Sequence, residues 1–114
     1  KNGQLFDKTI FKDGQWDGPV ETYYENGQLY HKGNYKDEKG HGLFVYYYDN
    51  GQLDYQNNYK NGKLDGIQLE YYENGKLKSK VNFKNDKKDG TEFFYLEDGT
   101  LEKTETYKDG DIVN

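Results

Sequence analysis

The sequence predicts an all-β fold, an elongated single-layer antiparallel β-meander of stacked hairpins. The first observation behind this prediction is a period of 24 residues, which Gly3, Gly27, Gly51, Gly75 and Gly99 follow, each with a leucine two positions later. The second is the composition, with 14 Gly, 13 Tyr, a single Pro and no Ala. Chains rich in glycine and tyrosine and without alanine favour strands joined by tight turns over helices.

Other positions of the 24-residue unit recur in the same way. An aromatic residue followed by lysine stands six positions after each of these leucines, and a second glycine series occupies residues 18, 42, 66 and 90. A fixed period of this length is the sequence signature of a repeat protein. Residues 1–114 are therefore expected to form one repeat array, with units at about 5–28, 29–52, 53–76 and 77–100 and a partial unit at 101–114.

Each unit is predicted to be one β-hairpin. Segments such as 43–48 and 67–72 alternate apolar residues with polar or aromatic ones, enter Asn-Gly and leave on leucine. The glycine of each Asn-Gly or Asp-Gly is expected to be a structural turn residue, because glycine tolerates positive φ. These turn residues are Gly27, Gly51, Gly75 and Gly99. Strands are predicted at 5–11, 18–24, 29–35, 43–48, 53–59, 67–72, 77–83, 91–96 and 101–107, with turn-rich links such as 12–18 and 36–42 between hairpins.

The register of the hairpins decides which residues share a face of the sheet. A two-residue loop sets Leu29 opposite Tyr24, whereas a three-residue loop with a glycine bulge sets it opposite Tyr23. The bulged loop separates the faces more cleanly and is the predicted one. It collects on one face Leu43, Val45, Tyr47, Leu53, Tyr55, Tyr59, Ile67, Leu69, Tyr71, Leu77, Val81 and Phe83.

Absences in the composition exclude several classes of function. Without Cys the chain has no disulfide, zinc–thiolate site or cysteine nucleophile. All 16 basic residues are lysine and the net charge is −5, so nucleic acid and anionic membrane lipid are both disfavoured as partners. No apolar run approaches the about 20 residues of a membrane span, and no signal peptide is evident. Because Met is absent, the chain is expected to be a processed or excised piece of a longer protein.

The motifs YYENGQL at 23–29, YYDNGQL at 47–53, YKNGKLDG at 59–66 and YYENGKL at 71–77 resemble the MORN repeat (membrane occupation and recognition nexus) in its bacterial variant form. The resemblance covers essentially the whole chain and implies an elongated sheet of stacked hairpins. Some members are similar to YwqK-type antitoxins, which implies binding and neutralising a toxin. Others are surface or secreted proteins, which implies a secreted or cell-envelope location in a bacterium rather than a cytoplasmic one.

Catalysis and metal binding receive little support from the residues present. Ser79 is the one serine, His31 and His41 are the two histidines, and the repeat pattern does not suggest that they converge with an acid. The acid-rich links 37–41 and 85–89 do not match the ligand spacing of a calcium loop, and their Asp and Asn residues suit turns. We therefore expect no enzymatic activity, no metal site and no cofactor.

Residues that break the repeat are the candidates for binding, because those at recurring positions are explained as scaffold. Phe44, Tyr46 and Tyr48 put three aromatic residues in one strand, on the face opposite Val45, where their replacement is expected to spare the fold. An aromatic patch rimmed by charge is typical of protein-binding surfaces, although a single-layer sheet also leaves one face exposed and can tolerate tyrosine there. The predicted binding residues are Phe44, Tyr46, Tyr48, Tyr24, Tyr30, Tyr72 and Phe94.

The leading hypothesis is a non-catalytic repeat scaffold that binds a protein partner, as an antitoxin or immunity-type protein binds a toxin. Two alternatives stay open. Tyrosine faces with Asn and Asp also suit sugars, which would fit surface adhesion or carbohydrate binding. A structural spacer within a longer repeat protein would need no partner for this segment.

Overall fold

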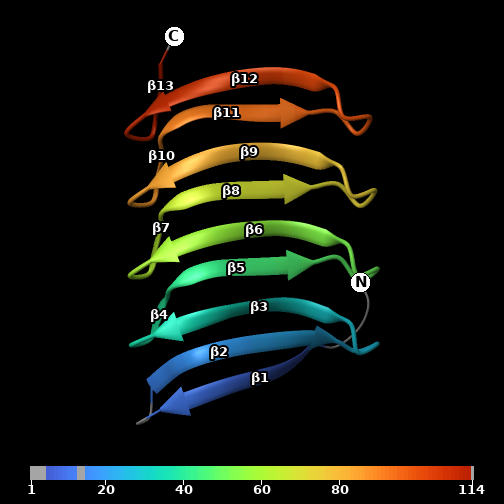
Figure 1. Cartoon of the computed structure of the whole chain (residues 1–114), viewed down its shortest axis with the longest axis vertical. Coiled ribbons are helices and arrows are strands. Elements are labelled where there is room, and N and C mark those ends of the chain that lie inside the picture. The colour runs from blue at the N-terminus through green and yellow to red at the C-terminus, as the bar shows by residue number, and fades with distance from the viewer. Residues whose placement is uncertain (1–4, 13–14, 114) are drawn as a thin grey trace.

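The chain folds as one open antiparallel sheet. The computed structural model describes the backbone of residues 5–12 and 15–113 and the side chains of 17–113, and within these residues thirteen strands and no helix are present (Figure 1). The predicted fold class is confirmed. Residues 13 and 14 of the predicted link at 12–18 lie outside the described residues. Among the described residues, no helix is long and apolar enough to cross a membrane.

Nine long strands build the body of the sheet, and their neighbours in the chain are their neighbours in space. These are β1 (Leu5–Lys12), β2 (Gln15–Tyr24), β3 (Leu29–Lys36), β5 (Gly42–Tyr47), β6 (Leu53–Lys60), β8 (Gly66–Tyr71), β9 (Leu77–Lys84), β11 (Gly90–Tyr95) and β12 (Leu101–Lys108). Short strands that were not predicted lie in the links: β4 (Lys39–Gly40), β7 (Lys63–Leu64) and β10 (Lys87–Lys88). Another unpredicted strand, β13 (Asp111–Val113), follows β12 and pairs with it.

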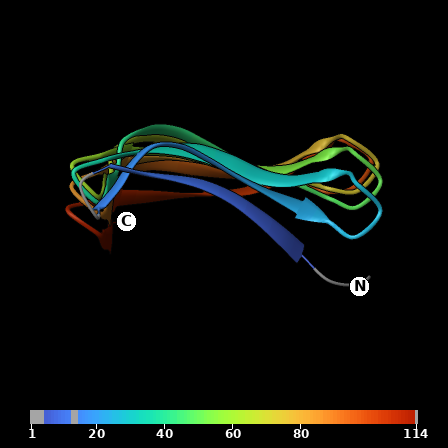
Figure 2. The same cartoon turned by 90° about the horizontal axis from the view of Figure 1, so that it is seen from below.

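The sheet is one layer thick and elongated. Its principal extents are 48 × 31 × 16 Å, and Figure 2 shows it edge-on as a single curved ribbon layer. The radius of gyration is 15.9 Å, against about 13 Å for a compact globule of this length. Among the described residues, each hairpin therefore packs against its neighbours along the array, and no second layer covers either broad face of the sheet.

The hairpin tips share one turn geometry, which agrees with the role predicted for the turn glycines. Gly27, Gly51, Gly75 and Gly99 have φ of 91, 90, 89 and 96°. The preceding Asn or Asp accepts a backbone hydrogen bond within the turn, as in Gln28 N to Asn26 Oδ1 at 2.9 Å. Because glycine adopts positive φ without steric cost, the repeated Asn-Gly accounts for the repeated tip.

The register next to each tip is the predicted one, but the faces assigned from it are wrong. Leu29 pairs with Tyr23 as expected, and then the register shifts so that His31 pairs with Thr22. Tyr30 is the extra residue of this bulge, and beyond it the parity of the strand is reversed. The same shift recurs in the next hairpin, where Phe44 pairs with Asn57.

We call the two sides of the sheet the aromatic face and the aliphatic face. The aromatic face carries Val20, His31, Gly33, Tyr35, Phe44, Tyr46, Tyr55, Asn57, Tyr59, Ser79, Val81, Phe83, Glu92 and Phe94. The aliphatic face carries Leu43, Val45, Ile67, Leu69 and Phe93. The predicted grouping of Leu43 and Val45 with Tyr55 and Tyr59 is therefore corrected.

Three of the four buried apolar residues lie on the aromatic face, namely Val20, Phe44 and Val81, and the fourth, Val45, lies on the aliphatic face. The predicted place of Phe44 in an accessible binding patch is therefore wrong. The Phe44 side chain is 3% exposed. It fits because the neighbouring strand has no side chain at Gly33, where a Cβ atom would overlap the Phe44 ring. Tyr35 and Tyr59 pack edge-on against the same ring, with centroids 5.6 and 5.0 Å away.

The two-residue turns at 37–38, 61–62, 85–86 and 109–110 have positive φ at both residues. This geometry suits glycine at the second position, as in Asn61 and Gly62 with φ of 53 and 82°. The equivalent turn of the preceding repeat has Asp37 and Glu38, with φ of 52 and 70°. Glu38 is therefore held in a conformation that a side chain with a Cβ atom adopts only at a cost.

Glu38→Gly is expected to raise the free energy of unfolding by about 1 kcal/mol, because it relieves the left-handed conformation at an exposed position. Urea denaturation followed by circular dichroism would measure the change. The reverse substitution at the equivalent site, Gly62→Glu, should lower stability by a similar amount. Equal midpoints for Glu38→Gly and the parent chain would show that this turn carries no strain.

Candidate functional site

Three aromatic rings from three adjacent strands stack across the aromatic face. The His31 ring of β3 lies 4.8 Å from the Tyr46 ring of β5, at an angle of 20°. The Tyr46 ring in turn lies 4.3 Å from the Tyr55 ring of β6, at 10°. All three side chains are half-buried. The stack is therefore ordered by its own contacts while one side of it stays accessible.

Tyr30 extends this stack to the hairpin tip. As the bulge residue, it turns toward the aromatic face, where its ring lies 5.1 Å from Tyr24 and 6.0 Å from Tyr46, edge-on to both. Edge-to-face contacts of this kind stabilise aromatic clusters. We refer to the half-exposed side chains of Tyr24, Tyr30, His31, Tyr46 and Tyr55 as the aromatic patch.

The structure brings together three of the seven predicted binding residues, Tyr24, Tyr30 and Tyr46. Phe44 lies beneath the surface, and the others lie elsewhere in the array: Tyr48, Tyr72 and Phe94. The prediction missed His31 and Tyr55, because it assigned alternate residues to opposite faces along each strand without allowing for the extra residue of the bulge. The sequence does hold a signal for this pair of residues. His31 and Tyr55 are 24 residues apart, so they occupy equivalent positions of two repeats, and both pair with Tyr46 of the strand between them.

The tyrosines next to the tips connect consecutive repeats. Tyr24 Oη donates to the Tyr47 carbonyl oxygen at 2.9 Å, and Tyr48 Oη donates to the Tyr71 carbonyl oxygen at 2.7 Å. Tyr72 Oη repeats the contact with Tyr95 O at 2.7 Å. The predicted binding residues Tyr48 and Tyr72 therefore have a structural role, whether or not they also contact a partner.

Tyr48→Phe should lower the free energy of unfolding by about 1 kcal/mol, because it removes one hydrogen bond between repeats and keeps the ring. Thermal melting would measure the loss. Tyr30→Phe is the control, since it removes a hydroxyl from the same side of the sheet without breaking this connection between repeats. Equal melting of the two variants would contradict the structural role of the Tyr48 hydroxyl.

Burial and nearby carboxylates raise the pKa of several tyrosines. Burial, followed by the charge of Asp54, raises the pKa of Tyr48 to about 12. Burial and a hydrogen bond to Glu105 raise the pKa of Tyr107 to about 12. Burial also raises the pKa of Tyr46, which lies inside the aromatic stack.

Stability is expected to fall as the pH rises from about 10 to about 12. In this pH range the unfolded chain loses phenol protons that the folded chain retains. Because the unfolded state then binds fewer protons than the folded state, the free energy of unfolding falls as the pH rises. Urea midpoints at pH 9, 10, 11 and 12 would measure the slope. Tyr48→Phe should flatten it, and a midpoint that does not depend on pH would contradict the raised pKa values.

Carboxylates border the aromatic patch on the side of the hairpin tips. Burial raises the pKa of the half-exposed Asp54, against the lowering effect of the nearby Tyr48 hydroxyl and Lys78 ammonium. Burial, Tyr30 and then the charges of Asp49 and Asp54 raise the pKa of Tyr24. The carboxylate of Asp54 thus acts on tyrosines of two different hairpins.

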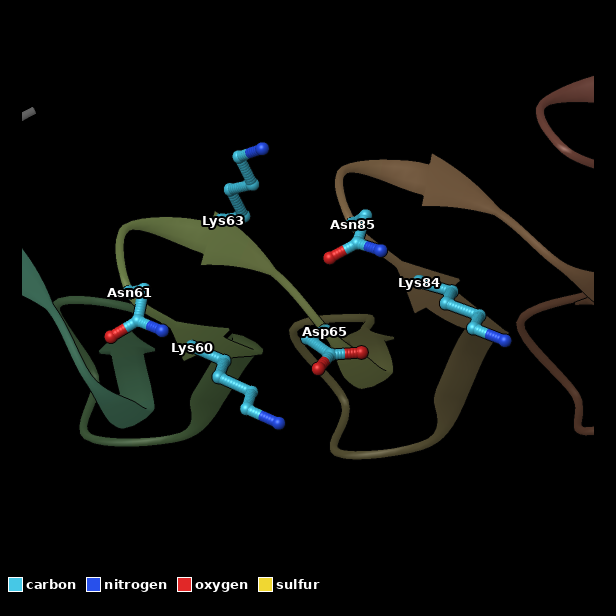
Figure 3. A pocket seen from close by; sticks show the side chains of 6 residues that line it. All are labelled: Lys60, Asn61, Lys63, Asp65, Lys84 and Asn85. Carbon is cyan, nitrogen blue, oxygen red and sulfur yellow. The ribbon is translucent and has the colours of Figure 1, made fainter.

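A shallow cleft of about 340 Å³ lies at the opposite edge, between two links. Its lining residues are Lys60, Asn61, Lys63, Asp65, Lys84 and Asn85. The three lysine amino groups do not converge on a common point (Figure 3). The cleft therefore lacks the focused charge that would hold a small anion.

The residues considered for catalysis or metal binding have other contacts. His31 Nδ1 lies 3.1 Å from Thr22 Oγ1 within the aromatic patch, and Ser79 Oγ donates to Glu70 Oε1 at 2.8 Å. Residues 37–38 and 85–86 form the positive-φ turns of the links. Among the side chains of residues 17–113, no group of three or more potential ligands is placed to hold a metal ion.

Stacked hairpins of a fixed length, joined by tyrosine hydrogen bonds, define a β-repeat scaffold. The model of the MORN repeat variant matches residues 16–37, 40–61, 64–85 and 88–109. The chain belongs to this family, which is generally non-enzymatic. No curated protein matches the chain at a significant level.

Proposed function

We propose that the chain is a non-catalytic repeat scaffold that binds a protein partner through the aromatic patch, in the manner of an antitoxin or immunity protein. The observation that supports this proposal is the ordered, half-exposed cluster of four tyrosines and a histidine on an otherwise open sheet face. Tyrosine is enriched at the centres of protein interfaces, because it brings a large contact area at low cost in conformational entropy.

The arrangement of the rings favours a protein over a sugar as ligand. Tyr46, at the centre of the stack, has both flat faces covered, by the rings of His31 and Tyr55 at interplanar angles of 20 and 10°. Stacking on the face of a sugar ring needs such a flat face to be free. The accessible edges of the patch instead offer ring hydrogens and hydroxyl groups, which suit the mixed polar and apolar surface of a protein.

Partner capture with the full chain tests the proposal. The captured protein is identified by mass spectrometry, and its affinity for the purified chain is measured by calorimetry. Tyr30→Ala should weaken binding by about 2 kcal/mol, the scale of an interface hot spot. Phe94→Ala is the matched control, because Phe94 is a half-exposed aromatic residue of the same face outside the patch.

Equal losses for the two variants would move the interface away from the patch, and unchanged binding for both would remove the aromatic face as the site. For the antitoxin role, co-expression of the captured protein should arrest growth, and the chain should restore it. A captured protein that is harmless on its own would contradict that role while leaving partner binding intact.

A further inference from the structure

We propose that the aliphatic face binds a second copy of the chain, with two sheets packed face to face about a two-fold axis that runs along β8. The inference does not depend on the proposed function, because the aromatic patch lies on the opposite face of the sheet. It is carried by exposed aliphatic side chains on inner strands, by the alternation of apolar and polar strands across the face, and by the pairs of residues that this axis brings together.

Large aliphatic side chains are exposed in the middle of the aliphatic face. Leu43 is 48% exposed and Ile67 is 38% exposed. They belong to the inner strands β5 and β8, which have further strands on both sides. Antiparallel sheets commonly keep a solvated face polar, so large apolar side chains exposed on inner strands indicate a surface that a partner covers.

Apolar and polar strands alternate across this face, as two rows of paired residues show. The first row, in the order of the strands from β3 to β12, consists of Lys32, Val45, Gln56, Leu69, Lys80, Phe93 and Thr104. The second row, from β5 to β12, consists of Leu43, Asn58, Ile67, Asn82, Thr91 and Thr106. In both rows β5 and β8 supply apolar residues, whereas β6, β9 and β12 supply polar ones.

A two-fold axis along β8, placed between two facing sheets, sets apolar strands on apolar strands. It places β8 over β8 of the second copy and β5 over β11, because these strands lie at equal distances from β8 in the sheet. Ile67 and Leu69 then face their own copies, and Val45 faces Phe93 of the second copy. The axis therefore brings the apolar residues of the first row together.

The same axis matches the polar residues, because it places β6 over β9. Gln56 faces Lys80 of the second copy, where the amide oxygen can accept a hydrogen bond from the ammonium group, and Asn58 faces Asn82. An axis along β6 would instead set Lys32 against Lys80, and an axis along β9 would set Lys80 against itself. Facing like charges disfavours both of these alternatives.

The aliphatic face is large enough for a stable interface. The two longer dimensions of the sheet are 48 and 31 Å, which exceed the about 800 Å² that each partner contributes to a standard interface. Facing sheets pack about 10 Å apart with their side chains interdigitated, so Leu43 and Ile67 would move from water into an apolar layer. The two aromatic patches would then point outward on opposite sides of the dimer.

Analytical ultracentrifugation of the full chain, at concentrations from micromolar to millimolar, tests the proposal and should show a dimer. Ile67→Lys should raise the dissociation constant of the dimer at least about a hundredfold, because two ammonium groups would face each other on the axis. Leu96→Lys is the matched control, since it makes the same change at a similarly exposed position of a hairpin tip, outside the aliphatic face. Its dissociation constant should stay within about threefold of that of the parent chain, and circular dichroism would verify that both variants keep the sheet.

Single cysteines locate the axis without adding charge, because the chain has no cysteine of its own. Ile67→Cys places two thiols opposite each other, and a short bis-maleimide should link two chains. Leu43→Cys is the control on the same face, since residue 43 lies four strand spacings, about 19 Å, from its own copy and should not be linked. Adding Thr91→Cys to Leu43→Cys should restore linking, because the axis sets these two residues against each other.

A monomer at every concentration would overturn the proposal, and so would a dimer in which Ile67→Lys and Leu96→Lys have equal dissociation constants. Equal linking of Ile67→Cys and Leu43→Cys would overturn the axis along β8. If Ile67→Lys loses the circular dichroism spectrum of the parent chain, the cysteine variants decide the result. Partner capture through Tyr30 is measured separately, so a failure of the dimer and a failure of the proposed function are distinguishable.

Discussion

Phe44→Ala is expected to lower the free energy of unfolding by about 3–5 kcal/mol. The side chain is 3% exposed, and its ring contacts side chains of β3 and β6, on the two sides of its own strand β5. Alanine would leave a cavity that two flanking strands cannot close without losing their own register. Because stability in a repeat array is the sum of local and nearest-neighbour terms, the loss should be concentrated in strands β3, β5 and β6.

Urea denaturation followed by circular dichroism would measure the effect, and hydrogen exchange would locate it. Phe94→Ala is the control, because Phe94 lies on the same face but is half-exposed and should cost much less. A midpoint of Phe44→Ala close to that of the parent chain would mean that the Phe44 ring is dispensable for the fold and belongs to an accessible surface.

The fold follows from the sequence because its main determinants are local and repeat every 24 residues. Asn-Gly or Asp-Gly at each tip and turn residues in each link determine where strands end. The short connections then leave antiparallel pairing of neighbours as the available arrangement. The short strands β4, β7 and β10 escaped prediction, because two-residue pairs within a link have no hydrophobic period.

The face on which each residue lies could not be predicted by continuing the alternation of side chains from one strand through the hairpin tip into the next. The position of the bulge is a property of backbone hydrogen bonding, in which Tyr24 N donates to Gln28 O and Gly27 N donates to Tyr24 O. One extra residue then exchanges the two faces for the rest of the strand. This single residue explains why Phe44 was expected at the surface and why His31 and Tyr55 were missed in the candidate site.

The packing of the aromatic face is set by pairs of residues on neighbouring hairpins rather than by single positions. Gln68 Nε2 donates to Asn57 Oδ1 at 2.7 Å, where the preceding pair of hairpins has Phe44 over Gly33. At the next position Glu92 lies opposite the buried Val81 and instead forms an ion pair at 2.8 Å with Lys88, four residues earlier in the chain. The first two pairs are thus matched in size or polarity across neighbouring hairpins, and the buried Glu92 finds its partner within its own hairpin.

Gly33→Ala is therefore expected to lower the free energy of unfolding by about 1–3 kcal/mol. The backbone of Gly33 does not require positive φ, and alanine in a strand would otherwise be favoured over glycine by up to about 1 kcal/mol. The predicted loss comes from overlap of the new Cβ atom with the Phe44 ring. Gly40→Ala should be milder, since its Cβ would lie 3.3 Å from the nearest atoms of Phe44 and Tyr59.

A double-mutant cycle separates overlap from any other effect of the methyl group. In a Phe44→Val background the ring is gone, and Gly33→Ala should become neutral or stabilising, with a coupling energy of at least about 1 kcal/mol between the two positions. Urea denaturation of the four chains would give this coupling. Additive losses would show that Gly33 and Phe44 do not contact each other, and the placement of Phe44 in the core of the array would then be wrong.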